Sequence, residues 1–191
     1  MLRAFVIATF VLAAYFASAA ENPVVEMQTS KGRVVIELWA EQAPVTVENF
    51  LRYVDGELYD GLIFHRVIPG FMVQGGGFDQ DMVEISTFDA IKNEAKPTLK
   101  NDRGTLAMAR TGVVDSATSQ FFINLVNNDY LNQRGTSPRD FGYAVFAEVI
   151  EGMEVIDEIA TVPTVTRRGH QDVPMEPVVI ESIRRIESQA D

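Results

Sequence analysis

Apolar and polar residues alternate in two short runs, 24–29 and 33–38, which are separated by the polar and glycine residues 30–32. This alternation predicts a β-hairpin. Between Pro44 and Gly56 the apolar positions instead follow a helical period, at Val47, Phe50, Leu51 and Val54. Proline suits the first turn of a helix and glycine its end, so this segment is predicted to form an amphipathic helix.

Further along, most of the chain is divided into short apolar runs bounded by Gly, Pro, Asn or Asp. We expect strands at residues 62–68, 71–74, 105–109, 120–126, 144–149 and 178–183. A second helical period appears at Met153, Ile156, Ile159 and Ala160. Many short strands with two helices predict an antiparallel β-barrel or sandwich with flanking helices rather than an alternating βαβ fold. Long loops are expected near 79–103, 127–142 and 161–177, where function often lies.

The first twenty residues have the pattern of a secretory signal peptide. Arg3 precedes an almost wholly apolar run, 4–16, and the small residues 17–20 follow it. We expect cleavage after Ala19 or Ala20, which leaves residues 21–191 as a single exported domain, periplasmic or secreted and without stable membrane association. An uncleaved membrane anchor is the alternative, although the run is shorter than the roughly 20 apolar residues that a span prefers.

Composition removes several classes of function. The 191 residues include 16 basic and 27 acidic side chains, for a net charge of -11, which argues against a nucleic-acid partner. The absence of cysteine excludes a disulfide framework, a thiolate metal site and a cysteine nucleophile. The only two histidines, His65 and His170, lie over a hundred positions apart in the sequence, so a multi-histidine metal cluster is not expected.

Three segments carry a specific resemblance to a known family. They are 64–78 (FHRVIPGFMVQGGGF), 104–110 (GTLAMAR) and 119–124 (SQFFIN). Together they resemble the signatures of the cyclophilins, which are peptidyl-prolyl cis-trans isomerases, and the resemblance extends over about residues 24–186. It implies a mainly β fold, a closed antiparallel β-barrel of about eight strands with two flanking α-helices. The acidic chain looks most similar to bacterial members, and the leader favours a periplasmic-like one.

The resemblance also implies an activity and a set of site residues. We expect rotation of Xaa-Pro bonds in exported, unfolded or partly folded polypeptides, by a monomer that needs no cofactor. A guanidinium that donates to the prolyl nitrogen would stabilise the twisted transition state without covalent chemistry. The catalytic residues would be Arg66, Gln74, Phe71 and Phe122. Substrate-binding residues would be Met72, Ala109, Arg110, Gln120, Tyr130, Leu131 and Tyr143.

Three positions depart from the common family pattern. Tyr130 stands where many members have tryptophan, Tyr143 where a histidine is usual, and Arg110 where an asparagine is common. None of these changes removes Arg66, so activity is expected to survive. Cyclosporin, which the family's tryptophan contacts, is expected to bind weakly.

Other functions fit the residues less well. The glycines 75–77 lack the spacing and the lysine of a phosphate-binding loop, and Ser116 and Ser119 lack histidine and aspartate at recognisable motif spacing. Two alternatives remain beside the isomerase. One is a peptide-binding chaperone or scaffold that uses the same groove without significant turnover, and the other is a β-barrel that carries a small ligand.

Overall fold

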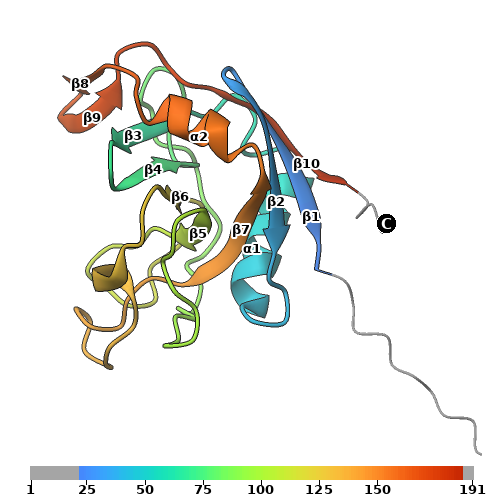
Figure 1. Ribbon diagram of the computed structural model, residues 1–191, viewed down its shortest axis with the longest axis vertical. Coiled ribbons are helices and arrows are strands. Elements are labelled where there is room, and N and C mark those ends of the chain that lie inside the picture. Colours follow the sequence, from blue (N-terminus) through green and yellow to red (C-terminus); the bar gives the residue numbers. More distant parts are fainter. Residues whose placement is uncertain (1–21, 187–191) are drawn as a thin grey trace, which may run out of the picture.

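The computed structural model describes residues 22–186, and the expected signal peptide and its cleavage site lie outside them. Eight antiparallel strands form one strongly curved sheet (Figure 1), in the order β10-β1-β2-β7-β5-β6-β4-β3. The strands are β1 (Val24–Thr29), β2 (Gly32–Leu38), β3 (Phe64–Ile68), β4 (Met72–Gly75), β5 (Thr105–Met108), β6 (Phe121–Asn124), β7 (Val145–Glu151) and β10 (Ile180–Ile186). All eight correspond to runs expected from the sequence.

The barrel is less completely closed than expected. The edge strands β3 and β10 meet only where they begin, through the antiparallel bridge between Ile63 and Val179. Beyond this point β10 follows β1 and β3 follows β4. A full ladder between the two edges, which closes a barrel, is therefore absent from residues 22–186.

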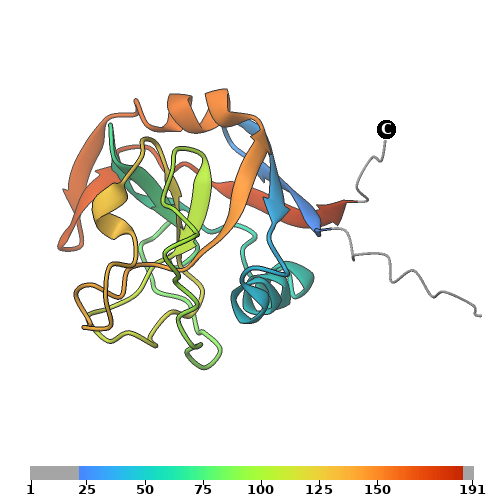
Figure 2. The same ribbon diagram turned by 60° about the horizontal axis from the view of Figure 1, so that its bottom comes forward.

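Two helices flank the curved sheet, as expected. Helix α1 (Pro44–Asp55) and helix α2 (Met153–Ile159) lie at opposite ends of it in Figure 2. The apolar face of α1 is buried, and its Phe50 ring lies 5.2 Å from Phe146 and 5.6 Å from Phe121, centroid to centroid. None of the helices within residues 22–186 is long and apolar enough to cross a membrane.

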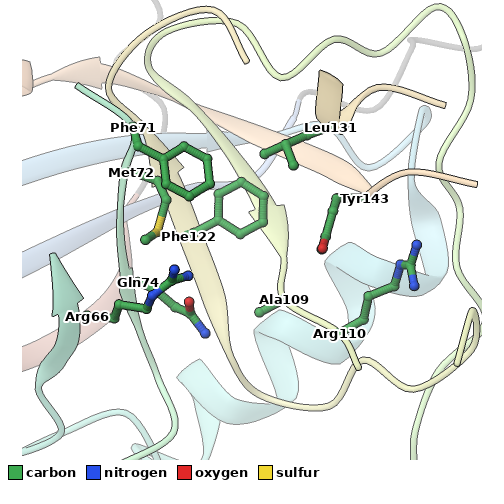
Figure 3. A pocket seen from close by; sticks show the side chains of 9 residues that line it. All are labelled: Arg66, Phe71, Met72, Gln74, Ala109, Arg110, Phe122, Leu131 and Tyr143. Carbon is green, nitrogen blue, oxygen red and sulfur yellow. The ribbon is translucent and has the colours of Figure 1, made fainter. Parts of the chain in front are cut away.

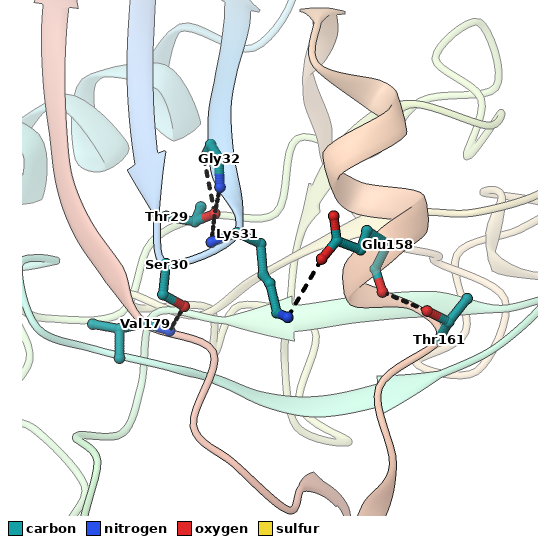
Figure 4. Close-up of polar contacts among 7 residues, drawn as sticks. All are labelled: Thr29, Ser30, Lys31, Gly32, Glu158, Thr161 and Val179. Carbon is teal, nitrogen blue, oxygen red and sulfur yellow. Dashed lines mark hydrogen bonds and ion pairs between the residues drawn. The ribbon is translucent and has the colours of Figure 1, made fainter.

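The turn between β1 and β2 is tied to α2. The hydroxyl of Thr29 accepts hydrogen bonds from the backbone N–H groups of Lys31 and Gly32, both at 3.1 Å (Figure 4). Lys31 forms an ion pair with Glu158 of α2 at 3.3 Å. Gly32 has φ +140°, and a Cβ there would lie 3.0 Å from Val155. The turn therefore needs glycine for its backbone and for close packing on α2.

The segment 161–177, expected as a long loop, is a second hairpin. Strands β8 (Thr164–Arg167) and β9 (His170–Pro174) pair with each other in a separate sheet. The turn uses Arg168 and Gly169, both with positive φ. The hairpin packs beside β3 (Figure 1), because Val173 is fully buried there with Ile63.

Candidate functional site

Cross-strand pairing brings three of the expected residues into one row. Arg66 of β3 pairs with Gln74 of β4, which pairs with Phe122 of β6. Residues opposite each other in a ladder present their side chains on the same face. The adjacent Phe121 points the other way, into the main core, as strand alternation predicts.

This row forms the floor of a pocket with a volume of about 230 Å³. Its apolar part is a cup of four side chains (Figure 3): Phe71, Met72, Phe122 and Leu131. Met72 and Phe122 are 2% and 4% exposed, so the base of the cup is buried. Leu131 ends a short 3-10 helix, η1 (Asp129–Leu131), from the loop after β6.

The turn between β3 and β4 is held by hydrogen bonds at Phe71. Its carbonyl accepts from the backbone N–H of Leu125 and from Nδ2 of Asn128, both at 3.0 Å. Gly70, just before it, has φ +70°. These contacts set the position of the Phe71 ring at the edge of the cup.

The polar side of the pocket consists of Arg66 and Gln74 (Figure 3). Nε2 of Gln74 donates to Oε1 of Gln120 at 2.9 Å, which orients the amide and leaves its second hydrogen for another acceptor. The side chain of Arg66 is 42% exposed. Within residues 22–186, its guanidinium has no hydrogen-bond acceptor, and its one ion-pair partner is Asp172 at 4.0 Å. The N–H groups of Arg66 therefore remain for a bound molecule.

Ala109, Arg110 and Tyr143 line the opposite side of the pocket. The guanidinium of Arg110 donates to the carbonyls of Thr111, Gly142 and Pro138 at 2.8 to 2.9 Å, and it lies 5.0 Å from the Tyr143 ring centroid. Figure 3 shows this guanidinium directed away from the cup. Arg110 therefore holds the loop that carries Tyr143, and only the rest of the residue faces the pocket.

Two expected site residues lie outside this lining. Gln120 reaches the site through its hydrogen bond to Gln74 and lines the neighbouring groove. Tyr130 is 57% exposed, with its ring centroid 5.9 Å from that of Phe71, so it stands on the rim. The exposure of Tyr130 depends on the path of the loop that contains η1. The spacing of residues in the sequence does not determine that path.

A groove on the other side of Arg66 was not expected from the sequence. It shares Arg66 and Gln74 with the pocket and is also lined by Glu84, His170 and Asp172. The one available sign of a hairpin here was Gly169, which follows the β-branched residues 164–166. No motif indicated that the carboxylate of Asp172 would lie near Arg66.

His65 is a structural residue of β3, as expected. It is 4% exposed, and burial, aided by the nearby His170, lowers its pKa to about 4. The imidazole is therefore neutral near pH 7. Its ring packs 4.7 Å from Phe78, on the face of the strand away from the cup.

An apolar cup edged by an arginine and an amide suits a small apolar ring next to a carbonyl. The residues that line this pocket include no Ser, Cys, His, Asp or Glu. Comparisons with known proteins identify such a family. The family model described as cyclophilin type peptidyl-prolyl cis-trans isomerase/CLD matches residues 24–185.

Similar proteins are also named peptidyl-prolyl cis-trans isomerases. A peptidyl-prolyl cis-trans isomerase of Acinetobacter baylyi is 55% identical over 168 residues, which cover 88% of this chain and 88% of that protein. Peptidyl-prolyl cis-trans isomerase B of Escherichia coli is 54% identical over 159 residues, covering 83% of this chain and 97% of that protein.

Solved structures agree with the fold. A crystal structure of a Cryptosporidium parvum cyclophilin type isomerase in the presence of the dipeptide Ala-Pro has a TM-score of 0.72 and 26% identity. It covers 86% of this chain and 99% of its own. With the pocket, the family match and these relatives in agreement, the chain belongs to the cyclophilin family of peptidyl-prolyl cis-trans isomerases.

Proposed function

We propose that this isomerase rotates Xaa-Pro bonds by non-covalent stabilisation of the transition state, with Arg66 as the principal donor. The barrier to rotation is about 18–20 kcal/mol, because the C–N bond has partial double-bond character. In the twisted state the prolyl nitrogen loses its resonance and regains a lone pair. A donor aimed at that nitrogen therefore binds the twisted state better than the planar ones.

The observation that carries this proposal is the position of Arg66 at the edge of the apolar cup. The proline ring would occupy the cup, which excludes water and strengthens a hydrogen bond at its border. The guanidinium stays charged at ordinary pH and has several N–H groups in a rigid fork. The remaining amide hydrogen of Gln74 is available for the neighbouring substrate carbonyl.

The substrates that we propose are exported polypeptides that are unfolded or partly folded. Support comes from the first twenty residues, whose pattern is that of a cleaved signal peptide and which would direct residues 21–191 to the periplasm or the exterior. Four apolar side chains form the cup, so recognition is expected to depend mainly on the proline ring. We expect the mature domain to act as a monomer without stable membrane association.

The test is cis-to-trans exchange of an Xaa-Pro peptide with the domain 21–191, in buffer without metal, nucleotide or thiol. Arg66→Ala should reduce kcat/KM by a factor equivalent to about 2–4 kcal/mol, the scale of losing one oriented donor in a dry site. Because Arg66 is partly exposed and packs little in the core, folding should change little. The matched control is Arg139→Ala, an exposed arginine outside the pocket lining.

Unchanged turnover by a folded Arg66→Ala protein would contradict the role of Arg66. A native domain that binds the peptide but does not accelerate exchange would instead favour the peptide-binding chaperone or scaffold. Loss of activity on addition of EDTA would contradict a mechanism that uses only protein groups.

A further inference from the structure

Charged and polar side chains gather in the groove beside Arg66, on the side away from the proline cup. The groove has a volume of about 630 Å³ and is lined by Glu84, His170 and Asp172 as well as by Arg66 and Gln74. The proposed mechanism uses only the last two. The carboxylates of this groove therefore have no role in it so far.

The β8–β9 hairpin that carries Asp172 is fixed against the sheet. Val173, the next residue, is fully buried with Ile63 and Phe78. The His170 ring lies 5.0 Å from Phe78 in an edge-on arrangement. Asp172 thus directly precedes a fully buried residue, which keeps it beside β3.

Asp172 adopts a backbone conformation that most residues avoid. Its φ is +61°, in the left-handed region, which aspartate and asparagine tolerate better than other non-glycine residues. In this conformation its Oδ2 lies 4.0 Å from Nε of Arg66, and both side chains are about 40% exposed. Within residues 22–186 this is the only ion pair that Arg66 forms.

We propose that Asp172 is a positioning residue for Arg66, an inference that rests on the proposed catalytic role of that arginine. A carboxylate beside Nε restrains the guanidinium, so that its terminal N–H groups remain directed toward the pocket. The same carboxylate also lowers the local positive charge. Orientation is the larger effect, because a hydrogen bond from Arg66 to the substrate weakens steeply when its angle departs from linear.

Two substitutions separate the carboxylate from the backbone conformation. Asp172→Asn removes the charge and keeps a residue that tolerates positive φ, and Asp172→Gly removes the side chain where glycine is unstrained. In the Xaa-Pro exchange assay we expect kcat/KM to fall about two- to fivefold, the upper part of the range of exposed ion pairs. The fall should lie in kcat with KM little changed, since the restraint acts on the transition-state contact.

Two further measurements distinguish positioning from a general structural effect. The loss should shrink at high salt, which screens the ion pair. In an Arg66→Ala background, assayed at high enzyme concentration, Asp172→Asn should cause no additional loss. The matched control is Glu176→Gln, which removes an exposed carboxylate just after the hairpin and should leave kcat/KM unchanged.

The outcomes separate this inference from the function on which it rests. Full activity of folded Arg66→Ala overturns both. An impaired Arg66→Ala with native or faster Asp172→Asn overturns only the positioning role. Equal losses from Asp172→Asn with and without Arg66 also overturn it, because the carboxylate would then act by another route. Unfolding midpoints for every variant identify any loss that comes from instability.

Discussion

At the scale of single residues, the pocket depends on which side chain occupies its rim. Tyr130 stands on the rim against Phe71, more exposed than any residue of the cup. Its hydroxyl leaves the ring at a different point from the indole N–H of a tryptophan. A bulky cyclic inhibitor that needs this donor should be affected more than a proline ring held by the cup.

We therefore expect an active enzyme that binds cyclosporin weakly and gains affinity from Tyr130→Trp. The restored donor and larger ring should tighten inhibitor binding by about 1–3 kcal/mol while changing turnover of a short peptide much less. Dissociation constants for both proteins test this, with Tyr130→Phe as the control that removes only the hydroxyl. Tight binding by the native chain, or no gain from the indole, would show that Tyr130 does not form this part of the wall.

His65 predicts a pH dependence of stability. Burial lowers its pKa from 6.5 to about 4, so between these values the unfolded state binds more protons than the native state. The free energy of unfolding should therefore fall as the pH is lowered through this window, by up to about 3 kcal/mol. Denaturant titrations at pH 7.5, 5.5 and 4.5 measure it.

His65→Gln should flatten this pH dependence, whatever its own effect on stability. The control His170→Gln removes the exposed histidine and should keep most of the slope, because burial is the larger cause of the lowered pKa. An unchanged slope in His65→Gln would mean that other groups titrate in this window.

At the scale of elements, α1 begins in an unusual way. Ala43 precedes Pro44 and supplies no capping side chain. Glu94, from the long loop before β5, takes that role: its carboxylate accepts from the N–H groups of Val45 at 3.2 Å and Thr46 at 2.7 Å, and from the Thr46 hydroxyl at 2.7 Å. A negative charge at a helix N-terminus is also favoured by the helix dipole.

Glu94→Ala should lower the free energy of unfolding by about 1–2 kcal/mol, the usual effect of losing a cap. The free energy of unfolding of Glu94→Gln should lie between those of the native protein and Glu94→Ala. An amide oxygen still accepts hydrogen bonds but carries no charge. Urea unfolding curves with equal slopes give the values. Glu41→Ala, an exposed carboxylate just before the helix, is the control. Equal stability of Glu94→Ala and the control would show that solvent satisfies these N–H groups equally well.

The elements also show where sequence reasoning succeeds. Eight strands and two helices were predictable, because most are short apolar runs or helical periods bounded by Gly, Pro, Asn or Asp. The β8–β9 hairpin was not predicted. Its strands are mostly exposed, with only Val173 and Pro174 buried, so they lack the apolar alternation of a strand with one buried face.

At the scale of the whole molecule, the proposed export concerns where the protein acts and whether residues 1–20 remain attached to it. If the signal peptide is cleaved, intact mass of the protein from cells should correspond to a chain that begins at Ala20 or Glu21. Fractionation should recover it away from membranes. A mass that includes residues 1–16, found in the membrane fraction, would favour the uncleaved anchor. Isomerase activity of the domain 21–191 is a separate measurement and does not depend on this result.

The sequence by itself determined the class of fold, the family and most residues of the pocket. Arg66, Met72 and Gln74 lie in one motif, and alternation along β6 directs Phe122 to the face opposite Phe121. The sequence reveals these residues because the alternation of a strand and the residues of a turn involve only a few neighbouring positions.

Only the tertiary structure decided which loops meet this face. It directed the guanidinium of Arg110 to loop carbonyls, left Tyr130 on the rim and brought Asp172 to within 4.0 Å of Arg66. It also supplied the cap of α1 from Glu94, 48 positions away from Thr46. These contacts join segments far apart in sequence, so they depend on how the curved sheet and its loops pack, which no local pattern of residues records.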